Sequence, residues 1–73
     1  MSLHDEPQTL RAFVAVARQG NVSRAAERLH LSQPAVSLQL KGLATNTGLV
    51  LFNRTPQGLT LTRDGAALLP QAE

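Results

Sequence analysis

Residues 33–43, near the middle of the chain, predict a helix with two opposed faces. On one side apolar residues recur at i, i+4 and i+7, the spacing of a helix face that packs into a core: Val36, Leu40 and Leu43. The other side carries mostly small and polar side chains: Gln33, Pro34, Ser37, Leu38 and Lys41. If the first face anchors the helix, the second forms a rigid ridge in solvent.

Two amphipathic segments precede this helix. Residues 7–19 carry an apolar repeat at i, i+3, i+4 and i+7, formed by Leu10, Phe13, Val14 and Ala17. Asp5 and Gln8 have the spacing of a capping box with Pro7 in the first turn, and Gly20 is expected to end the helix.

The second of these segments is expected to be capped by Asn21 and to point Ala25, Ala26 and Leu29 inward. His30 and Leu31 then form a turn. Ser32 is a favourable N-cap for the central helix and Pro34 suits its first turn, so this helix should begin abruptly with its free N–H groups directed outward.

Beyond Leu43 the pattern changes to that of a hairpin followed by a last helix. The stretch 44–47 contains poor helix formers, and Gly48 is the expected stop. The short apolar run 49–52, the turn residues 55–58 and the alternation over 59–62 predict a small β-hairpin with Arg54 and Gln57 near its tip. Thr62 is expected to cap a last helix that runs into Pro70 and the chain end. The order is that of a mainly α winged helix-turn-helix.

Composition narrows the class of protein. The chain has 73 residues, 42% of them hydrophobic and none of them cysteine, which fits one small domain without disulfides or a thiolate metal site. Its apolar runs are too short to span a membrane, and the N-terminus has no signal-peptide pattern. We therefore expect a cytoplasmic protein without a membrane partner.

Positive charge is concentrated in the body of the chain. The span from Arg11 to Arg63 holds all seven basic residues and one acid, Glu27, which gives a local charge of +6. The other acids lie at or beyond the ends of this span. A basic body favours a polyanionic partner, although a solvated basic surface would look the same.

The candidate chemistry argues against an enzyme. His4 and His30 are distant and have no carboxylate placed beside them, and Ser32 and Ser37 have no base. Two histidines without cysteine make no metal site. The hydroxyls, amide and aliphatic tips of the exposed ridge instead suit base edges in a DNA major groove, which is wide enough to admit a helix.

Four motifs together resemble the N-terminal DNA-binding domain of LysR-type transcriptional regulators. They are A-A-x-x-L at 25–29, S-Q-P-A-V-S-x-Q-L at 32–40, L-F-x-R at 51–54 and L-T-x-x-G at 61–65. The resemblance implies a bacterial regulator that binds double-stranded promoter DNA and acts in the cytoplasm at the nucleoid. It also implies a division into a tail (1–6), a winged helix-turn-helix (7–62) and the truncated start of a linker helix that pairs two subunits (63–73).

The same resemblance implies the assembly and the cofactors. Full-length members of the family are expected to be homodimers or tetramers and to bind a small-molecule effector in a domain that this fragment lacks. We therefore expect no cofactor in the fragment, and a monomer or a weak dimer.

Positions that match the base-reading residues of the family are Gln33, Pro34, Ser37 and Leu38. A glutamine can pair with adenine or bond a guanine edge, and proline and leucine can contact thymine methyl groups. An incidental surface leucine is the alternative for Leu38.

The remaining candidates concern the DNA backbone. Ser23 and Ser32 are expected to meet phosphates at helix starts, with simple capping as the alternative. Arg54 matches the wing arginine, whose alternative role is a surface ion pair, and Gln57 lies at the wing tip. Weaker phosphate candidates, for which a solvated surface is equally compatible, are Arg24, Arg28 and Lys41.

Three positions depart from the family pattern. Ala44 stands where a glutamate is usual, which leaves open how the end of the central helix is tethered. Gln57 replaces a second basic residue, which implies a weaker grip by the wing, and Asn21 replaces a serine as an equally good cap. A winged helix that binds only protein is the rival function, and it predicts no salt-sensitive binding to DNA.

Overall fold

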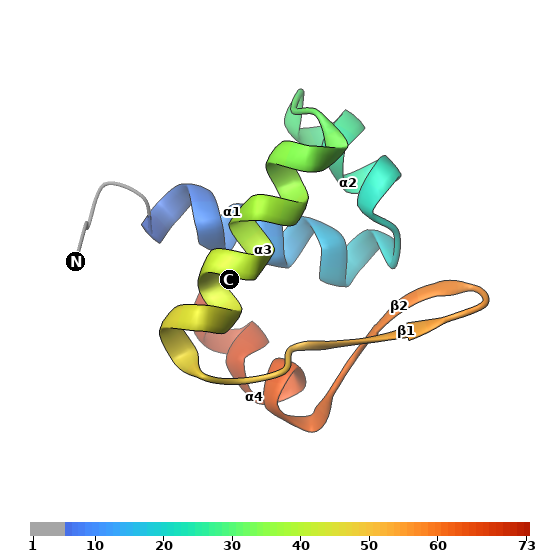
Figure 1. Cartoon of the computed structure of the whole chain (residues 1–73). Coiled ribbons are helices and arrows are strands. Elements are labelled where there is room, and N and C mark those ends of the chain that lie inside the picture. The colour runs from blue at the N-terminus through green and yellow to red at the C-terminus, as the bar shows by residue number, and fades with distance from the viewer. Residues whose placement is uncertain (1–5) are drawn as a thin grey trace.

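The structure, a computed structural model that describes residues 6–73, has the predicted order of elements (Figure 1). They are α1 (Glu6–Gln19), α2 (Val22–Leu29), α3 (Gln33–Thr47), β1 (Phe52–Thr55), β2 (Gly58–Leu61) and α4 (Arg63–Ala72). The two strands pair antiparallel in one hairpin. This is the expected winged helix-turn-helix, mainly α. The proposed cap at Asp5 lies outside the described residues.

Side-chain caps start three of the helices at the predicted positions. The Asn21 side chain accepts a hydrogen bond from the Arg24 N–H at 3.0 Å, and Ser32 Oγ accepts one from Ala35 N–H at 3.2 Å. Thr62 Oγ1 accepts one from Gly65 N–H at 3.0 Å. Each cap satisfies an N–H group that has no partner within its own helix, so α2, α3 and α4 begin where the sequence indicates.

The core has two clusters that share α1. The first joins α1 to α2 and α3 through Ala12, Val16, Ala25, Ala26 and Val36. The second joins α1 to the end of α3 and the start of the hairpin through Phe13, Leu43 and Leu51. Because α1 is covered from both sides, it forms the centre of the domain.

The predicted inward face of α1 is wrong in part. Its fully buried residues are Ala12, Phe13 and Val16, whereas Leu10 and Val14 are half-buried at the margin of the second cluster. Ala17 is also half-buried and belongs to neither cluster. The physical reason is that α1 contacts α2 and α3 as well as α4, so its buried face is wider and rotated relative to a single stripe.

The α3 helix continues past Leu43 to Thr47, through residues that the sequence predicts to be poor helix formers. Thr47 Oγ1 donates a hydrogen bond to the Leu43 carbonyl at 2.9 Å and accepts one from Leu49 N–H at 3.2 Å. Gly48 then ends the helix in a left-handed conformation, with φ of 71° and its N–H bound to the Ala44 carbonyl. The expected stop is confirmed, and hydrogen bonds of the Thr47 hydroxyl and the Gly48 N–H tether this end without the glutamate of the family pattern.

The hairpin begins later than the sequence pattern indicates, whereas α4 follows the expected course toward the chain end. Leu51 lies in the core before β1 begins, and its carbonyl accepts a hydrogen bond from Thr62 N–H at 3.0 Å. The helix α4 runs through Pro70 to Ala72. In Figure 1 the hairpin projects sideways from the helices, and α4 lies beside its base.

Candidate nucleic-acid interface

The two predicted faces of α3 are opposed in the structure. Val36 is fully buried and Leu43 nearly so, while Leu40 packs against both core clusters. The other side is exposed along its whole length: Gln33, Pro34, Ser37, Leu38 and Lys41. Leu38 is 70% exposed, the highest value among the large apolar side chains of the described residues. Burial of one side thus fixes a free ridge on the other.

The start of α3 is set by the turn that precedes it. His30 adopts the left-handed conformation with φ of 58°, and the Leu31 N–H bonds to the Ala26 carbonyl at 2.9 Å. Ser32 then caps α3. Ala25 and Ala26 are buried and small, so α2 can pack closely against its neighbours and hold this turn in place. The first turn of α3 therefore projects from a well-defined corner.

Gln39 has a positioning role that the sequence analysis missed. Its side-chain oxygen accepts a hydrogen bond from Thr9 Oγ1 at 2.6 Å, which ties α3 to α1 across a part-buried interface. Gln39 stands in the S-Q-P-A-V-S-x-Q-L motif, which is the signal that could have drawn attention to it. Its partner is 30 residues away, and no local pattern identifies it.

The hairpin tip lies beside the start of the helix-turn-helix. Thr55 pairs with Gly58, so residues 56 and 57 form a two-residue loop. A groove of about 390 Å³ separates this tip from the starts of α2 and α3, and four of the predicted site residues line it: Ser23, Gln33, Arg54 and Gln57. The fold therefore brings together residues from three separate segments of the sequence.

Three further candidates, Ser32, Arg24 and Lys41, lie near the ends or on the free sides of the helices. Ser32 Oγ is engaged as the cap of α3, whereas Asn21, and not Ser23, caps α2, so the Ser23 hydroxyl lines the groove. Arg24 and Lys41 are exposed. Within residues 6–73 the one ion pair joins Arg18 to Glu73, so the structure gives Arg54 no such partner.

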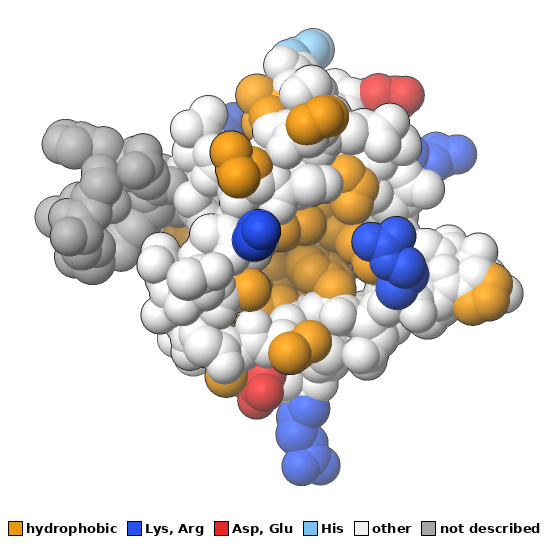
Figure 2. All heavy atoms as spheres, in the orientation of Figure 1, with side chains coloured by type: hydrophobic (Ala, Val, Ile, Leu, Met, Phe, Trp, Pro, Cys, Tyr) orange, Lys and Arg blue, Asp and Glu red, His pale blue; other side chains and the backbone are white. Residues whose placement is uncertain are grey.

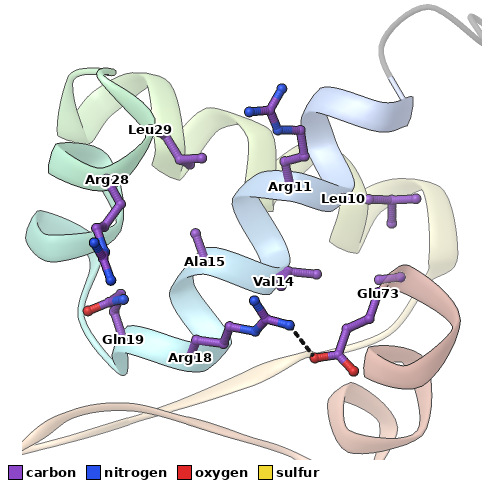
Figure 3. A pocket seen from close by; sticks show the side chains of 10 residues that line it. Leu10, Arg11, Val14, Ala15, Arg18, Gln19, Arg28, Leu29 and Glu73 are labelled. Atoms are coloured by element: carbon purple, nitrogen blue, oxygen red, sulfur yellow. Dashed lines mark hydrogen bonds and ion pairs between the residues drawn. The ribbon is translucent and has the colours of Figure 1, made fainter.

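Arg28 is not brought together with the other candidates. It lines a different hollow, between α1, α2 and the end of α4, together with Arg11 and Arg18 (Figure 3). In this hollow Arg18 donates a hydrogen bond to the Glu73 carboxylate at 3.1 Å. Leu10, Val14 and Leu29 also line it. The hollow is lined by neither the exposed ridge of α3 nor the hairpin tip.

The face that α3 presents is mainly neutral and basic. Figure 2 shows two basic side chains on either side of a hollow beside α3, with apolar side chains at its floor. Acidic side chains visible in this view lie toward the outline of the molecule and away from the hollow. A polyanion approaching α3 would therefore meet little like-charge repulsion.

Residues 6–73 show neither a metal centre nor a membrane span. No group of three or more histidine, cysteine, aspartate or glutamate side chains gathers within this range. None of the helices described is both long and apolar enough to cross a bilayer.

Comparisons with known proteins agree on one family. Residues 7–66 match the family model described as "Bacterial regulatory helix-turn-helix protein, lysR family". Over 67 residues the chain is 46% identical to the HTH-type transcriptional regulator ClcR of Pseudomonas putida and 49% identical to TfdS of Cupriavidus pinatubonensis. These matches cover 92% of the chain but only 23% of each relative.

Solved structures extend this likeness to the fold. The protein in the crystal structure of the CbnR_DBD–DNA complex superposes with a TM-score of 0.87 at 40% identity, over 99% of this chain and 78% of that one. The BenM_DBD/catB site 1 DNA complex gives a TM-score of 0.87 at 29% identity, over 99% of this chain and 76% of that one.

Proposed function

The chain belongs to the LysR family of bacterial regulatory helix-turn-helix proteins, and we propose that it binds promoter DNA sequence-specifically, with α3 in the major groove and the hairpin along the adjacent minor groove or backbone. Membership of this family identifies the chain as a DNA-binding domain, and its relatives are transcriptional regulators. The wing is the hairpin formed by β1 and β2.

The observation that carries the proposal is the exposed ridge of α3. A helix held in place by Val36 and Leu43 presents a continuous row of small, polar and apolar side-chain ends. An α-helix with its side chains is about 10–12 Å in diameter, so it fits a major groove about 12 Å wide. The groove beside Gln33 links this ridge to the wing. The structures of CbnR_DBD and BenM_DBD are complexes with DNA, which supports DNA binding by this chain.

Base reading is assigned to the ridge. Gln33, at the start of α3, would offer its amide to an adenine or guanine edge, and Ser37 would donate or accept according to the base. Pro34 and Leu38 would contact thymine methyl groups. The 70% exposure of Leu38 supports this role, because contact with such a methyl group would remove apolar surface from water.

Positioning on the phosphates is assigned to the surrounding residues. Ser23, Ser32 and the free N–H groups at the helix starts would meet phosphates, as would Arg24 and Lys41. Arg54 and Gln57 would contact the minor groove or its borders, with a weaker grip than two basic residues would give. Arg28 is left outside the proposed interface because it lines the hollow of Figure 3.

Selection of bound duplexes from a random pool, followed by footprinting, tests the proposed function. We expect one enriched sequence, protected over a major groove and the flank under the wing, with an affinity that falls as salt rises. If the chain shows no salt-sensitive binding to any duplex, the proposal is wrong, and that result is the one that the rival function as a protein-binding module predicts.

The first variant to examine is Gln33→Ala. We expect a loss of about 1–3 kcal/mol in binding free energy at one base position, with relaxed preference there. Titration against all single-base variants of the selected duplex measures this. Gln71→Ala, at an exposed position of α4, is the matched control and should leave the preferences unchanged. A uniform loss across all duplexes would show that Gln33 does not read bases.

Arg54→Ala should act differently. Because a phosphate contact is independent of sequence, we expect weaker binding to every duplex and a slope of affinity against salt that is smaller by about one. Arg28→Ala is the matched control, since that side chain lies in the other hollow. An unchanged salt slope for Arg54→Ala would remove this residue from the set of phosphate contacts.

Assembly, effector binding and location complete the proposal. We propose that α4 begins the linker helix that pairs two subunits, and that effector binding lies outside residues 1–73. In this proposal the full-length protein is a homodimer or tetramer in the cytoplasm at the nucleoid. The 73-residue chain alone should sediment as a monomer or weak dimer and bind single half-sites weakly. A tight dimer in analytical ultracentrifugation without DNA would contradict this expectation.

A further inference from the structure

The wing is fastened to the turn between α1 and α2. The Gly20 carbonyl accepts a hydrogen bond from the Leu59 N–H of β2 at 3.0 Å. Gly20 also ends α1, with φ of 67° and its N–H bound to the Val16 carbonyl at 2.7 Å. Asn21, the next residue, caps α2. One short segment therefore holds the end of α1, the start of the helix-turn-helix and the wing.

Gly58 makes this contact possible. Its φ is 133°, and a Cβ at this position would lie closer than 3.0 Å to the Gly20 carbonyl oxygen. Backbone at such a close approach cannot yield as a flexible side chain can, so any L side chain at position 58 must push the wing away. Thr55 Oγ1 also donates to the Gly58 carbonyl at 3.1 Å, which binds the same residue to the opposite strand.

The hydrogen bond between Leu59 and Gly20 lies where it can set the distance between the wing and α3, the two elements proposed to contact DNA. Gln57 lies in the loop that Thr55 and Gly58 close, Arg54 stands just before Thr55, and Gln33 lines the same groove as both. A two-stranded hairpin is at best marginally stable on its own, so its tip needs an anchor to keep a fixed direction. The base of the hairpin is joined to α4, and the Gly20 carbonyl supplies an anchor close to the tip.

We propose that Gly58 and Gly20 are positioning residues that fix the wing relative to α3, so that both contact DNA as one rigid surface. This inference rests on the proposed function. It predicts that loss of the contact removes the contribution of Arg54 while Arg54 itself is still present.

A double-mutant cycle between Gly58→Ala and Arg54→Ala tests the inference. Each single change should weaken binding to the selected duplex roughly tenfold, the value of one charge-assisted contact, and the double variant should be no weaker than the weaker single one. Gly58→Ala should also lower the salt slope as Arg54→Ala does, although no charge has been removed. Additive losses, or an unchanged salt slope in Gly58→Ala, would overturn the proposal.

Two chemically synthesised variants separate the contact from the turn itself. D-alanine at position 58 accepts a positive φ and directs its methyl group away from the Gly20 carbonyl, so binding should stay within about twofold of the parent chain. An ester in place of the amide between Gly58 and Leu59 removes the N–H donor to Gly20 and also weakens the Gly58 carbonyl as the acceptor for Thr55. This variant should reproduce the smaller salt slope, and Thr55→Val, which removes only the hydrogen bond from Thr55, is its control. Full binding by the ester variant would contradict a role for this hydrogen bond.

Amide exchange without DNA distinguishes failure of the inference from failure of the proposed function. The Leu59 N–H should be protected in the parent chain and exchange at least tenfold faster in Gly58→Ala, while the amides of α3 keep their protection. An unprotected Leu59 amide in the parent chain would refute the anchored wing. Protection in a chain that binds no duplex would refute only the DNA-binding function.

Discussion

Replacing Phe13 with alanine is expected to destabilise the domain by about 3–5 kcal/mol, the usual cost of removing a buried phenylalanine side chain. Phe13 is fully buried in α1, and its ring lies 5.5 Å from that of Phe52, tilted by 58°. A domain of this size is stable by only roughly 4–11 kcal/mol. The variant should therefore be largely unfolded at moderate temperature, and urea unfolding followed by circular dichroism measures the loss.

Phe13→Leu provides the matched control for this prediction. It keeps an apolar side chain of similar reach and should cost less than about half as much as alanine, because the cavity that remains is smaller. Circular dichroism suits the measurement because the chain has no tryptophan or tyrosine. A cost below about 1 kcal/mol for Phe13→Ala would show that the second core cluster does not depend on this ring.

Gly65→Ala should have the second-largest effect, a net loss of about 1–3 kcal/mol in the free energy of unfolding. Gly65 is buried in the first turn of α4, where an added Cβ would lie closer than 3.0 Å to the Leu51 carbonyl oxygen and 2.9 Å from Leu61 Cδ2. Alanine favours a helix over glycine by about 1 kcal/mol, so steric overlap must exceed that gain for the prediction to hold.

Gly42→Ala separates these two effects. Gly42 lies within α3, and a Cβ there would meet nothing within 4 Å, so only the helix preference acts. We expect this variant to be stabilised by up to about 1 kcal/mol in the same urea experiment. If both glycine variants gained stability alike, α4 would not press against Leu51 as the structure has it.

Local signals predicted most of the architecture. Asn21, Ser32 and Thr62 cap helices as expected because a cap depends on residues within three positions of it. The opposed faces of α3 were also predictable, because helical periodicity alone separates Val36 from Leu38. The site followed from the same periodicity together with four motifs, and only the fold could bring Ser23, Gln33 and Arg54 to one groove.

The differences arise where distant contacts override local preference. The end of α3 is held by the burial of Leu43 against Phe13 and Leu51, so the helix continues through residues of weak helix preference. Ala12 and Val16 are buried because α2 and α3 lie against them, which periodicity within α1 does not reveal. Contact between Thr9 and Gln39, or between Gly20 and Leu59, depends on the tertiary arrangement and has no local signature.

The hairpin is pinned at both of its ends, and this determines where the domain can change in length. Its base is held by the bond from Thr62 to Leu51, and its far half by Gly20. An insertion between these points would shift the strand register and detach one anchor. Residues 56 and 57, at the loop tip, lie beyond both, so added residues would extend into open solvent. The length of the wing tip can therefore change in evolution without changing the two anchors that fix the direction of the hairpin.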